Sequence, residues 1–244
     1  MLIVSISYGR AGRVKTRDLF PNVILAVVES QYDEYVEKNG GEIMKLPESC
    51  AGSIPRTRNY VLDQAKGDEW VAILDDDISE IGRFGGATGE RHHVPMTQEE
   101  VLTLMAHGSL MADELGTGLW GINLQNDPKF FREYTPLSLS APVLGPFSVH
   151  KASAGIRYEN RFWLKEDYDL YLQHLHRFHK VLRFNAFYYL ADHKDNSGGA
   201  VSFRTYDEEV RQNLMLQAKW GAHVVQIRNE KSLDPKITPP IPGV

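Results

Sequence analysis

Strand-like and helix-like patterns alternate through the first half of this chain, and that order constrains the fold more than any other feature. Apolar and β-branched runs predict strands over Leu2–Ser7, Val23–Val28 and Trp70–Leu74. Helical patterns lie between them at Gln31–Lys38 and Ser53–Gln64. Strands that alternate with helices are typical of a mainly parallel sheet with helices on its faces. We therefore expect an α/β domain with a nucleotide-binding type of layout.

The rest of the chain continues this pattern around one interruption. Gly82–Pro95 holds four glycines, and we expect a mobile loop there that can act as a lid. A capping box at Thr97–Glu100 predicts a helix to about Leu115. Further strands are expected over Leu119–Leu124, Ala141–Val149 and Val181–Leu190, and further helices over Trp163–Phe178 and Tyr206–Trp220.

Composition bounds the class of protein. The 244 residues suffice for one large α/β domain, and 42% hydrophobic with 24% charged residues is ordinary for a folded soluble protein. No stretch approaches the roughly 18 apolar residues that span a bilayer, and the N-terminal run has no basic leader, so it predicts a strand rather than a signal peptide. Cys50 stands alone, which excludes an internal disulfide and fits a cytoplasmic location. The net charge of −5 argues against indiscriminate nucleic-acid coating.

The most informative motif follows the strand expected at Trp70–Leu74. Three consecutive carboxylates, Asp75, Asp76 and Asp77, end this apolar run. On an extended chain alternate side chains point the same way, so Asp75 and Asp77 should face one pocket while Asp76 turns away and is dispensable. Two like charges together favour a divalent cation between them. The alternative is a solvated turn, although such turns normally carry Gly, Asn or Pro.

A second acidic site opens the helix expected over Trp163–Phe178. A helical wheel puts Asp167 on the apolar face, with Glu166 and Asp169 on more polar flanks. An ionised, partly desolvated carboxylate near a helix N-terminus suits a general base. The alternative is a carboxylate that only complements the helix dipole.

Positive charge is expected around the same pocket. Arg58 falls on the inward stripe of the helix at Ser53–Gln64, where a buried guanidinium needs an anion, either a bound diphosphate or an aspartate of the acidic run. The loop after the first strand carries Tyr8, Arg10 and Arg13 among glycines and lies where open α/β sheets bind ligands. A solvated basic turn is the alternative, because the glycines match no dinucleotide or P-loop pattern.

Late in the chain, a histidine and two glycines add to the candidate site. His193 follows a late strand and is a candidate metal ligand, with His92 and His93 as rivals. Gly198 and Gly199 allow a phosphate to approach the backbone closely.

Taken together, these elements resemble a GT-A glycosyltransferase: a basic loop after strand one, an Arg-bearing helix, Asp75-x-Asp77 after an apolar strand, and Glu166-Asp167 opening a later helix, with His193 downstream. The resemblance implies a UDP-sugar donor, UDP-glucose as the first candidate, with Asp75 near the ribose or uracil. It implies Mn²⁺ or Mg²⁺ on Asp75, Asp77 and His193, and Asp167 as the base of an inverting transfer, with Glu166 as its catalytic neighbour. Donor contacts are assigned to Ser7, Tyr8, Arg10, Arg13, Glu29, Arg58, Asp75, Asp76, Gly198 and Gly199.

The same resemblance implies one GT-A type domain over residues 1–244, a mainly parallel mixed sheet flanked by helices on both faces. Residues 1–80 would be its nucleotide-sugar-binding half, residues 96–230 its acceptor-binding half, and residues 231–244 a Pro-rich tail.

A narrower likeness is to the phage glycosyltransferases associated with TET-type dioxygenases. It is carried by residues 7–16, 56–62, 75–77, 165–170 and 198–204. The likeness implies a DNA partner that contains 5-hydroxymethylcytosine, and the host cytoplasm as location. A basic cluster that can track phosphates lies beyond the candidate base, at His174, His176, Arg177, His179, Lys180 and Arg183, with a solvated helix end as its alternative.

Three rival interpretations stay open. A haloacid-dehalogenase-type phosphatase also places Asp-x-Asp after an apolar strand, but its motif usually opens the chain, whereas here it follows two other strands. A non-catalytic GT-A-like module would hold a nucleotide or nucleic acid without turnover, although every candidate carboxylate is present. A GT-A transferase with a saccharide or small-molecule acceptor is the third.

Overall fold

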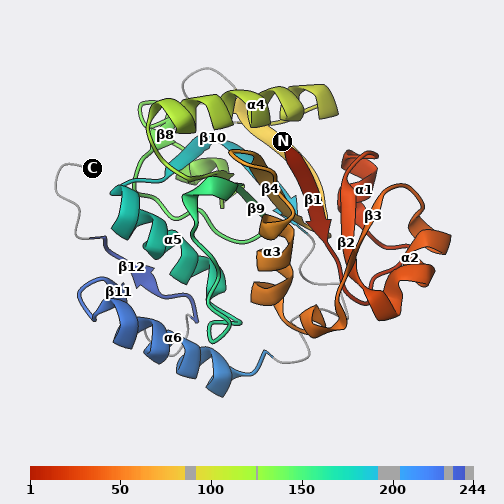
Figure 1. Cartoon of the computed structure of the whole chain (residues 1–244). Coiled ribbons are helices and arrows are strands. Elements are labelled where there is room, and N and C mark those ends of the chain that lie inside the picture. Colours follow the sequence, from red (N-terminus) through yellow and green to blue (C-terminus); the bar gives the residue numbers. More distant parts are fainter. Residues whose placement is uncertain (86–91, 125, 192–203, 228–232, 240–244) are drawn as a thin grey trace.

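The computed structural model describes residues 1–85, 92–124, 126–191, 204–227 and 233–239, which form one mixed sheet with helices on both faces (Figure 1). In spatial order the strands are β3 (Ile43–Leu46), β2 (Ile24–Val28), β1 (Leu2–Ile6), β4 (Trp70–Asp75), β9 (Phe147–Lys151), β7 (Leu119–Asn123), β10 (Leu182–Ala191), β5 (Ile78–Gly85) and β6 (His92–Pro95), with β8 (Leu137–Ser138) beside β10. Strands β9, β5 and β8 run opposite to the others. A small second sheet pairs β11 (Val225–Gln226) with β12 (Lys236–Ile237).

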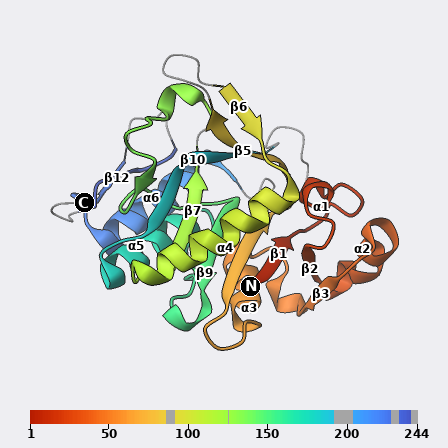
Figure 2. The same cartoon turned by 90° about the horizontal axis from the view of Figure 1, so that it is seen from above.

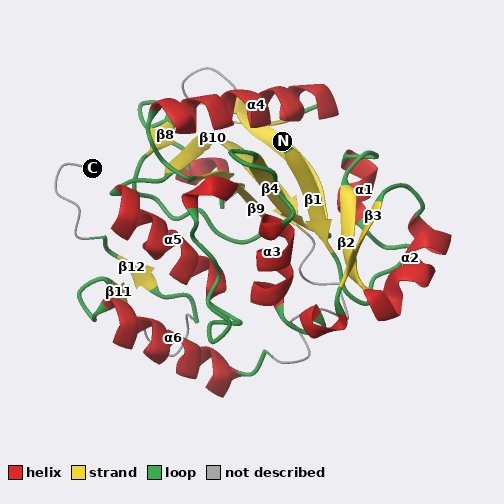
Figure 3. Ribbon diagram, in the orientation of Figure 1, coloured by secondary structure: helices red, strands yellow, loops and turns green. Residues whose placement is uncertain are grey.

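The helices form a layer on each side of this sheet. They are α1 (Lys15–Leu19), α2 (Tyr32–Asn39), α3 (Ile54–Asp63), α4 (Gln98–Glu114), α5 (Glu166–Phe178) and α6 (Tyr206–Trp220), with 3-10 turns η1 (Glu29–Gln31), η2 (Glu48–Cys50), η3 (Pro128–Phe130) and η4 (Ala152–Ala154). Helix α4 crosses one face, while α3 and α5 lie on the other and α6 lies beyond α5 (Figures 2 and 3). The expected α/β fold, with a mostly parallel sheet between helices, is confirmed.

The central strand β4 shows why both faces are covered. Trp70, Ala72 and Leu74 belong to the core beneath α4, whereas Val71 and Ile73 belong to the core shared with α3 and α5. Because side chains alternate along a strand, an uninterrupted apolar run needs a helix layer on each side. Strand β4 therefore lies in the middle of the molecule, and the three carboxylates lie at its carboxyl end.

The expectation of a loop over Gly82–Pro95 is wrong at both ends, where β5 and β6 pair in antiparallel register. Residues 86–91 lie outside the described part of the chain. A Cβ at Gly82 would come within 2.3 Å of the Tyr188 hydroxyl, and one at Gly85 within 2.7 Å of Val94. These glycines make room for neighbouring side chains, so their presence in the sequence signals close packing rather than mobility.

Two further expected boundaries can be compared with the structure, one at a strand that contains prolines and one at a helix cap. The strand expected over Ala141–Val149 begins only at Phe147, because Pro142 and Pro146 cannot donate to a ladder. The Thr97–Glu100 capping box is confirmed by both of its hydrogen bonds. None of the helices in the described ranges is long and apolar enough to cross a membrane.

Candidate active site

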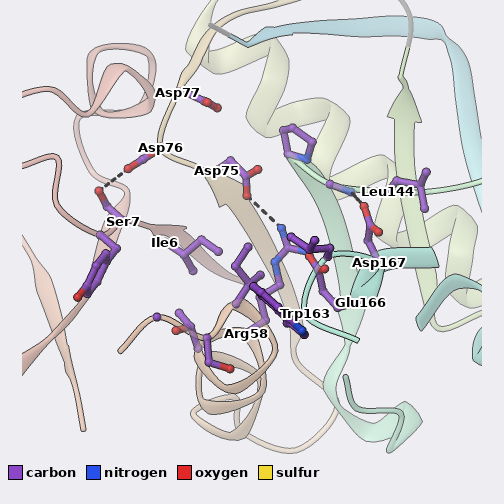
Figure 4. A pocket seen from close by; sticks show the side chains of 18 of the residues that line it. Ile6, Ser7, Arg58, Asp75, Asp76, Asp77, Leu144, Trp163, Glu166 and Asp167 are labelled. Atoms are coloured by element: carbon purple, nitrogen blue, oxygen red, sulfur yellow. Dashed lines mark hydrogen bonds and ion pairs between the residues drawn. The ribbon is translucent and has the colours of Figure 1, made fainter. Parts of the chain in front are cut away.

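A cavity of about 450 Å³ opens at the carboxyl ends of β1 and β4. These strands are parallel neighbours with Ile6 opposite Asp75, so the loops that follow them meet at one edge of the sheet. The loop after β1, the acidic run after β4, helix α3 and the start of α5 all contribute to its wall (Figure 4). Segments more than 150 residues apart in the sequence therefore share one cavity.

The three aspartates after β4 point in two directions. In Figure 4 Asp76 extends toward Ser7, whereas Asp75 and Asp77 extend the other way. All three nonetheless line the cavity, because Asp76 and Asp77 lie in the turn after β4 rather than in the strand, so the expectation that Asp76 turns away from the pocket is wrong. Asp76 is only 4% exposed and accepts hydrogen bonds from Ser7 Oγ and Arg10 Nη1. Burial outweighs these two bonds and raises the pKa of Asp76 to about 6. Asp76 thus links the loop after β1 to the end of β4. The expectation that Asp76 is dispensable did not include this link.

A buried hydroxyl pair completes the attachment of that loop. Ser7 Oγ lies 2.7 Å from Tyr35 Oη, and the Arg10 amide donates to the same Tyr35 oxygen at 2.9 Å. Tyr8 and Arg10 line the cavity beside Ser7. Burial raises the pKa of Tyr35, so this phenol stays neutral and keeps its proton for hydrogen bonding.

Two assigned donor contacts lie outside the cavity wall. Arg13 is exposed and donates to the Gly9 carbonyl at 3.0 Å. The Glu29 side chain is 64% exposed and lies 3.6 Å from Lys45. Neither is among the described residues that line the cavity, because one belongs to the outer turn of the loop and the other to the 3-10 turn after β2. The remaining assignments, His193, Gly198 and Gly199, lie outside the described residues.

The acidic run offers two carboxylates to a divalent ion. No group of three or more His, Cys, Asp or Glu side chains gathers into a metal site within the described ranges. Mg²⁺ and similar ions are usually bound through one or two carboxylates together with substrate phosphates and water. The side chains of Asp75 and Asp77, which both line the cavity, fit that kind of donor set.

Arg58 is a buried cation of the site. It is 2% exposed, and its Nη2 lies 3.1 Å from Asp75 Oδ1 while its Nη1 lies 3.3 Å from Glu166 Oε1. The guanidinium also covers the Tyr158 ring, 5.5 Å from the centroid. The inward stripe of α3 predicted its burial and one aspartate partner. The Glu166 contact spans 108 residues and had no local signal in the sequence.

The start of α5 places two acidic side chains on the cavity. Glu166 is 6% exposed, and Asp167 is partly exposed and accepts from the Gly145 amide at 3.1 Å and from the Tyr168 amide at 2.8 Å. Burial and the neighbouring Asp167 carboxylate raise the pKa of Glu166 to about 8, although Arg58 opposes both effects. Burial also raises the pKa of Asp167, against the pull of Arg58. Both carboxyls therefore bind a proton more readily than an exposed carboxyl does.

The helical wheel misjudged the flanks of α5. Asp169 is fully buried, where it accepts from Lys219 Nζ at 2.6 Å and from Trp220 Nε1 at 2.8 Å. Both partners come from the C-terminal end of α6, which covers a second side of α5. A wheel drawn for one helix assumes a single buried face, and α5 has two.

The basic cluster after the candidate base does not share one surface. His174 is 2% exposed, and burial lowers its pKa to about 3. It stacks on Phe178 in the interior. Arg183 Nε donates to Asn185 Oδ1, two residues further along β10, at 2.8 Å. The histidine is therefore neutral, and the proposed phosphate-tracking surface is reduced to the exposed residues at the end of α5.

Several further residues line the cavity without having been predicted, namely Trp163, Tyr168, Tyr189, Lys165, Arg204 and Asp234. Trp163 and Tyr168 flank the Glu166-Asp167 pair in the sequence, and that proximity could have identified them. Arg204 and Asp234 come from the C-terminal part, and only tertiary packing brings them to the cavity.

One family model matches most of the sequence, and solved structures share the fold. The family model of TET-Associated Glycosyltransferases matches residues 1–199. No curated protein matches the chain in sequence.

Solved structures with the same fold are distant in sequence. Glucosyl-3-phosphoglycerate synthase from Mycobacterium tuberculosis, crystallised with Mn²⁺, UDP and phosphoglyceric acid, is 11% identical with a TM-score of 0.54, over 97% of this chain and 86% of that one. Its complex with Mn²⁺, UDP-glucose and phosphoglyceric acid has a TM-score of 0.53 at 11% identity, over 97% and 85%. TarS residues 1–349 from S. aureus is 12% identical with a TM-score of 0.46, over 94% and 75%. The first two likenesses show that the fold is GT-A.

Proposed function

Because the chain belongs to the TET-associated glycosyltransferase family, we propose that it moves a hexose from a UDP-sugar, with UDP-glucose the first candidate, to the hydroxyl of 5-hydroxymethylcytosine in DNA. One observation carries the proposal: a single cavity is lined both by the acidic run after β4 and by Glu166 and Asp167. A sugar transfer needs these two functions, a diphosphate site and a base, within reach of one another. The UDP, UDP-glucose and Mn²⁺ complexes of the mycobacterial synthase support the choice of donor.

The first half of the chain, residues 1–80, would hold the donor. Asp75 and Asp77, with His193 as a further ligand, would bind Mn²⁺ or Mg²⁺, and this ion would neutralise charge on the departing UDP. Ser7, Tyr8 and Arg10 would contact the nucleotide from the loop after β1. Arg10 lies 3.7 Å from Asp77 Oδ2, so a guanidinium is close to the position proposed for the diphosphate.

Asp167 would act as the base. As the acceptor oxygen attacks the anomeric carbon, its proton passes to the Asp167 carboxylate and the bond from that carbon to UDP breaks. The amides of Gly145 and Tyr168 hold one carboxylate oxygen each, which fixes the direction in which the base points. A single displacement of this kind inverts the anomeric centre. Glu166 would assist by holding Arg58.

Aromatic side chains in the cavity wall also support the proposal that the acceptor is a planar base. Trp163, Tyr168 and Tyr189 line the same space as Asp167. Enzymes that modify a base in DNA take it out of the helix and stack it on aromatic side chains. These rings would serve an extruded hydroxymethylcytosine in that way. Residues 96–230, the acceptor-binding half, include all three.

Incubation with labelled UDP-glucose and Mn²⁺ tests the proposal, with plain DNA and DNA that contains hydroxymethylcytosine as parallel acceptors. We expect label only on the hydroxymethylated DNA, and none after addition of EDTA. Transfer to a saccharide but to neither DNA would refute the acceptor and leave the transferase. Asp167→Asn should abolish transfer and retain UDP binding, while Glu114→Gln, on the exposed side of α4, is the matched control with full activity. Full activity of Asp167→Asn would refute the assigned base.

A further inference from the structure

A buried ammonium stands directly before the two candidate catalytic carboxylates. Lys165 is the residue before α5, and its side chain is 1% exposed. Its Nζ lies 2.7 Å from Glu209 Oε2, donates to the Leu233 carbonyl at 3.0 Å and lies 3.7 Å from Asp234 Oδ1. Lys165, Glu166 and Asp167 all line the cavity, and the lysine side chain also reaches the C-terminal part of the chain.

The partners of this lysine come from the C-terminal part of the chain. Glu209 belongs to α6, is fully buried and also accepts from Arg204 Nε. Asn213, one turn further along α6, donates to the Leu233 carbonyl at 2.8 Å. This group joins the start of α5 to α6 and to residues 233–234; its Lys165 and Glu209 side chains are buried, whereas those of Arg204 and Asp234 are 56% and 72% exposed. A buried charge that loses its partner is strongly unfavourable, so the buried Lys165–Glu209 pair holds these segments together.

This C-terminal part lies beyond residues 1–199, which the family model matches, yet it helps to build the cavity. Arg204 and Asp234 line it together with Lys165. The backbone of Lys165 is bonded to that of Glu166, so a fixed lysine side chain limits where the first turn of α5 can lie. Small displacements of a catalytic group, on the order of 1 Å, can slow a reaction about 100-fold.

We infer that the Lys165–Glu209 ion pair, fastened by the Leu233 carbonyl, positions Asp167 for proton transfer, and that Glu209 is a positioning residue of the enzyme. The inference rests on the proposed function, since it assumes that Asp167 is the base. It assigns to α6 and the segment after it a part in turnover, although neither Glu209 nor Leu233 contacts the reacting groups.

Glu209→Gln provides the kinetic test. We expect kcat for transfer from UDP-glucose to fall about 10- to 100-fold. KM for UDP-glucose should stay within about threefold of wild type, since the described donor contacts lie on α3 or at and after the ends of β1 and β4, away from Glu209. Glu159→Gln is the matched control: Glu159 pairs with Lys219 of α6 at 2.5 Å and has no contact with Lys165 among the described ion pairs. An unchanged kcat in Glu209→Gln, with wild-type transfer intact, would overturn the inference and leave the proposed function.

Two further measurements separate positioning from folding and from activity. The double variant Lys165→Met, Glu209→Leu removes both buried charges, so we expect its thermal stability to equal that of the wild type. Its kcat should still be at least about tenfold lower than that of the wild type. A normal kcat in this stable double variant would contradict the inference. Amide hydrogen exchange of the peptide 163–170 reads the position of the first turn without turnover. It should speed up in Glu209→Gln and stay unchanged in Glu159→Gln. Absence of transfer by the wild type would refute the proposed function, and the exchange result would still decide whether the ion pair holds the helix start.

Discussion

Replacement of Arg58 by methionine tests how the buried charges of the site are held together. The Arg58 side chain is 3% exposed and lies 3.1 Å from Asp75 and 3.3 Å from Glu166. Removal of one partner from a fully buried ion pair costs about 3–5 kcal/mol. The Asp75 side chain is 30% exposed, and solvent screens part of its interaction. We therefore expect Arg58→Met to lower the free energy of unfolding by about 2 kcal/mol at pH 7.

The loss should grow at alkaline pH because of Glu166. Burial raises the pKa of this carboxyl from 4.5 to about 8, and Arg58 opposes the rise. Between these two values the folded protein keeps a proton that the unfolded chain has released, so stability declines as pH rises until the folded carboxyl ionises. Without Arg58 the folded pKa is higher, and the decline continues past pH 8. This adds about 1.4 kcal/mol to the loss at pH 9.

Urea unfolding followed by circular dichroism at pH 7 and pH 9 measures both effects. Arg56→Met, an exposed position on the same helix, is the matched control and should change stability by less than about 0.5 kcal/mol. Equal losses for Arg58→Met at the two pH values would refute the coupling between Arg58 and Glu166. A loss at both pH values no larger than that of the control would refute the stabilising role of the buried pairs.

Three further predictions concern other parts of the molecule. Asp76→Asn removes the charged acceptor of Arg10, so KM for the donor should rise about tenfold with little change in kcat. Steady-state kinetics measure both constants, and a fall in kcat with an unchanged KM would contradict this role. Gly108→Ala puts a Cβ 2.8 Å from the buried Trp120 ring, so thermal denaturation should show about 1–2 kcal/mol of destabilisation despite the better helix propensity of alanine; a higher Tm would contradict the packing argument. Burial lowers the pKa of His174 from 6.5 to about 3, so the wild type should lose about 2 kcal/mol of stability through this residue between pH 7 and pH 5. His174→Leu should show a correspondingly smaller loss in urea titrations, and an unchanged pH dependence would contradict the assignment.

Local signals were enough to predict most of the elements. The helix over Tyr206–Trp220 has the bounds expected from its periodicity and from Gly221, and Ser53 caps α3 through the Arg56 amide. The acidic run and the inward-facing Arg58 were also found in this way. Each of these depends on residues within one or two turns of one another, which a sequence pattern records directly.

Contacts between distant segments could not be read from the sequence. The burial of Asp169 depends on Lys219 and Trp220, and the burial of Lys165 depends on Glu209. In both cases a polar residue is buried because a complementary one arrives from α6. A single-sequence pattern treats such residues as solvent-facing, since their type alone does not report a buried partner.

Arg58 joins the two ends of the candidate site into one system of charges. One guanidinium nitrogen faces Asp75, on the side proposed for the donor, and the other faces Glu166 on the side proposed for the base. In the proposed reaction a cation held by Asp75 would weaken the interaction of that carboxylate with Arg58 and would leave more of the guanidinium charge to Glu166 and Asp167. A stronger positive field would lower the pKa of both carboxyls, so Asp167 would be ionised more often with the donor in place. Because such coupling is reciprocal, the ionised base would in turn favour the bound cation. The shared arginine thus gives a physical reason why donor binding would prepare the base before an acceptor arrives.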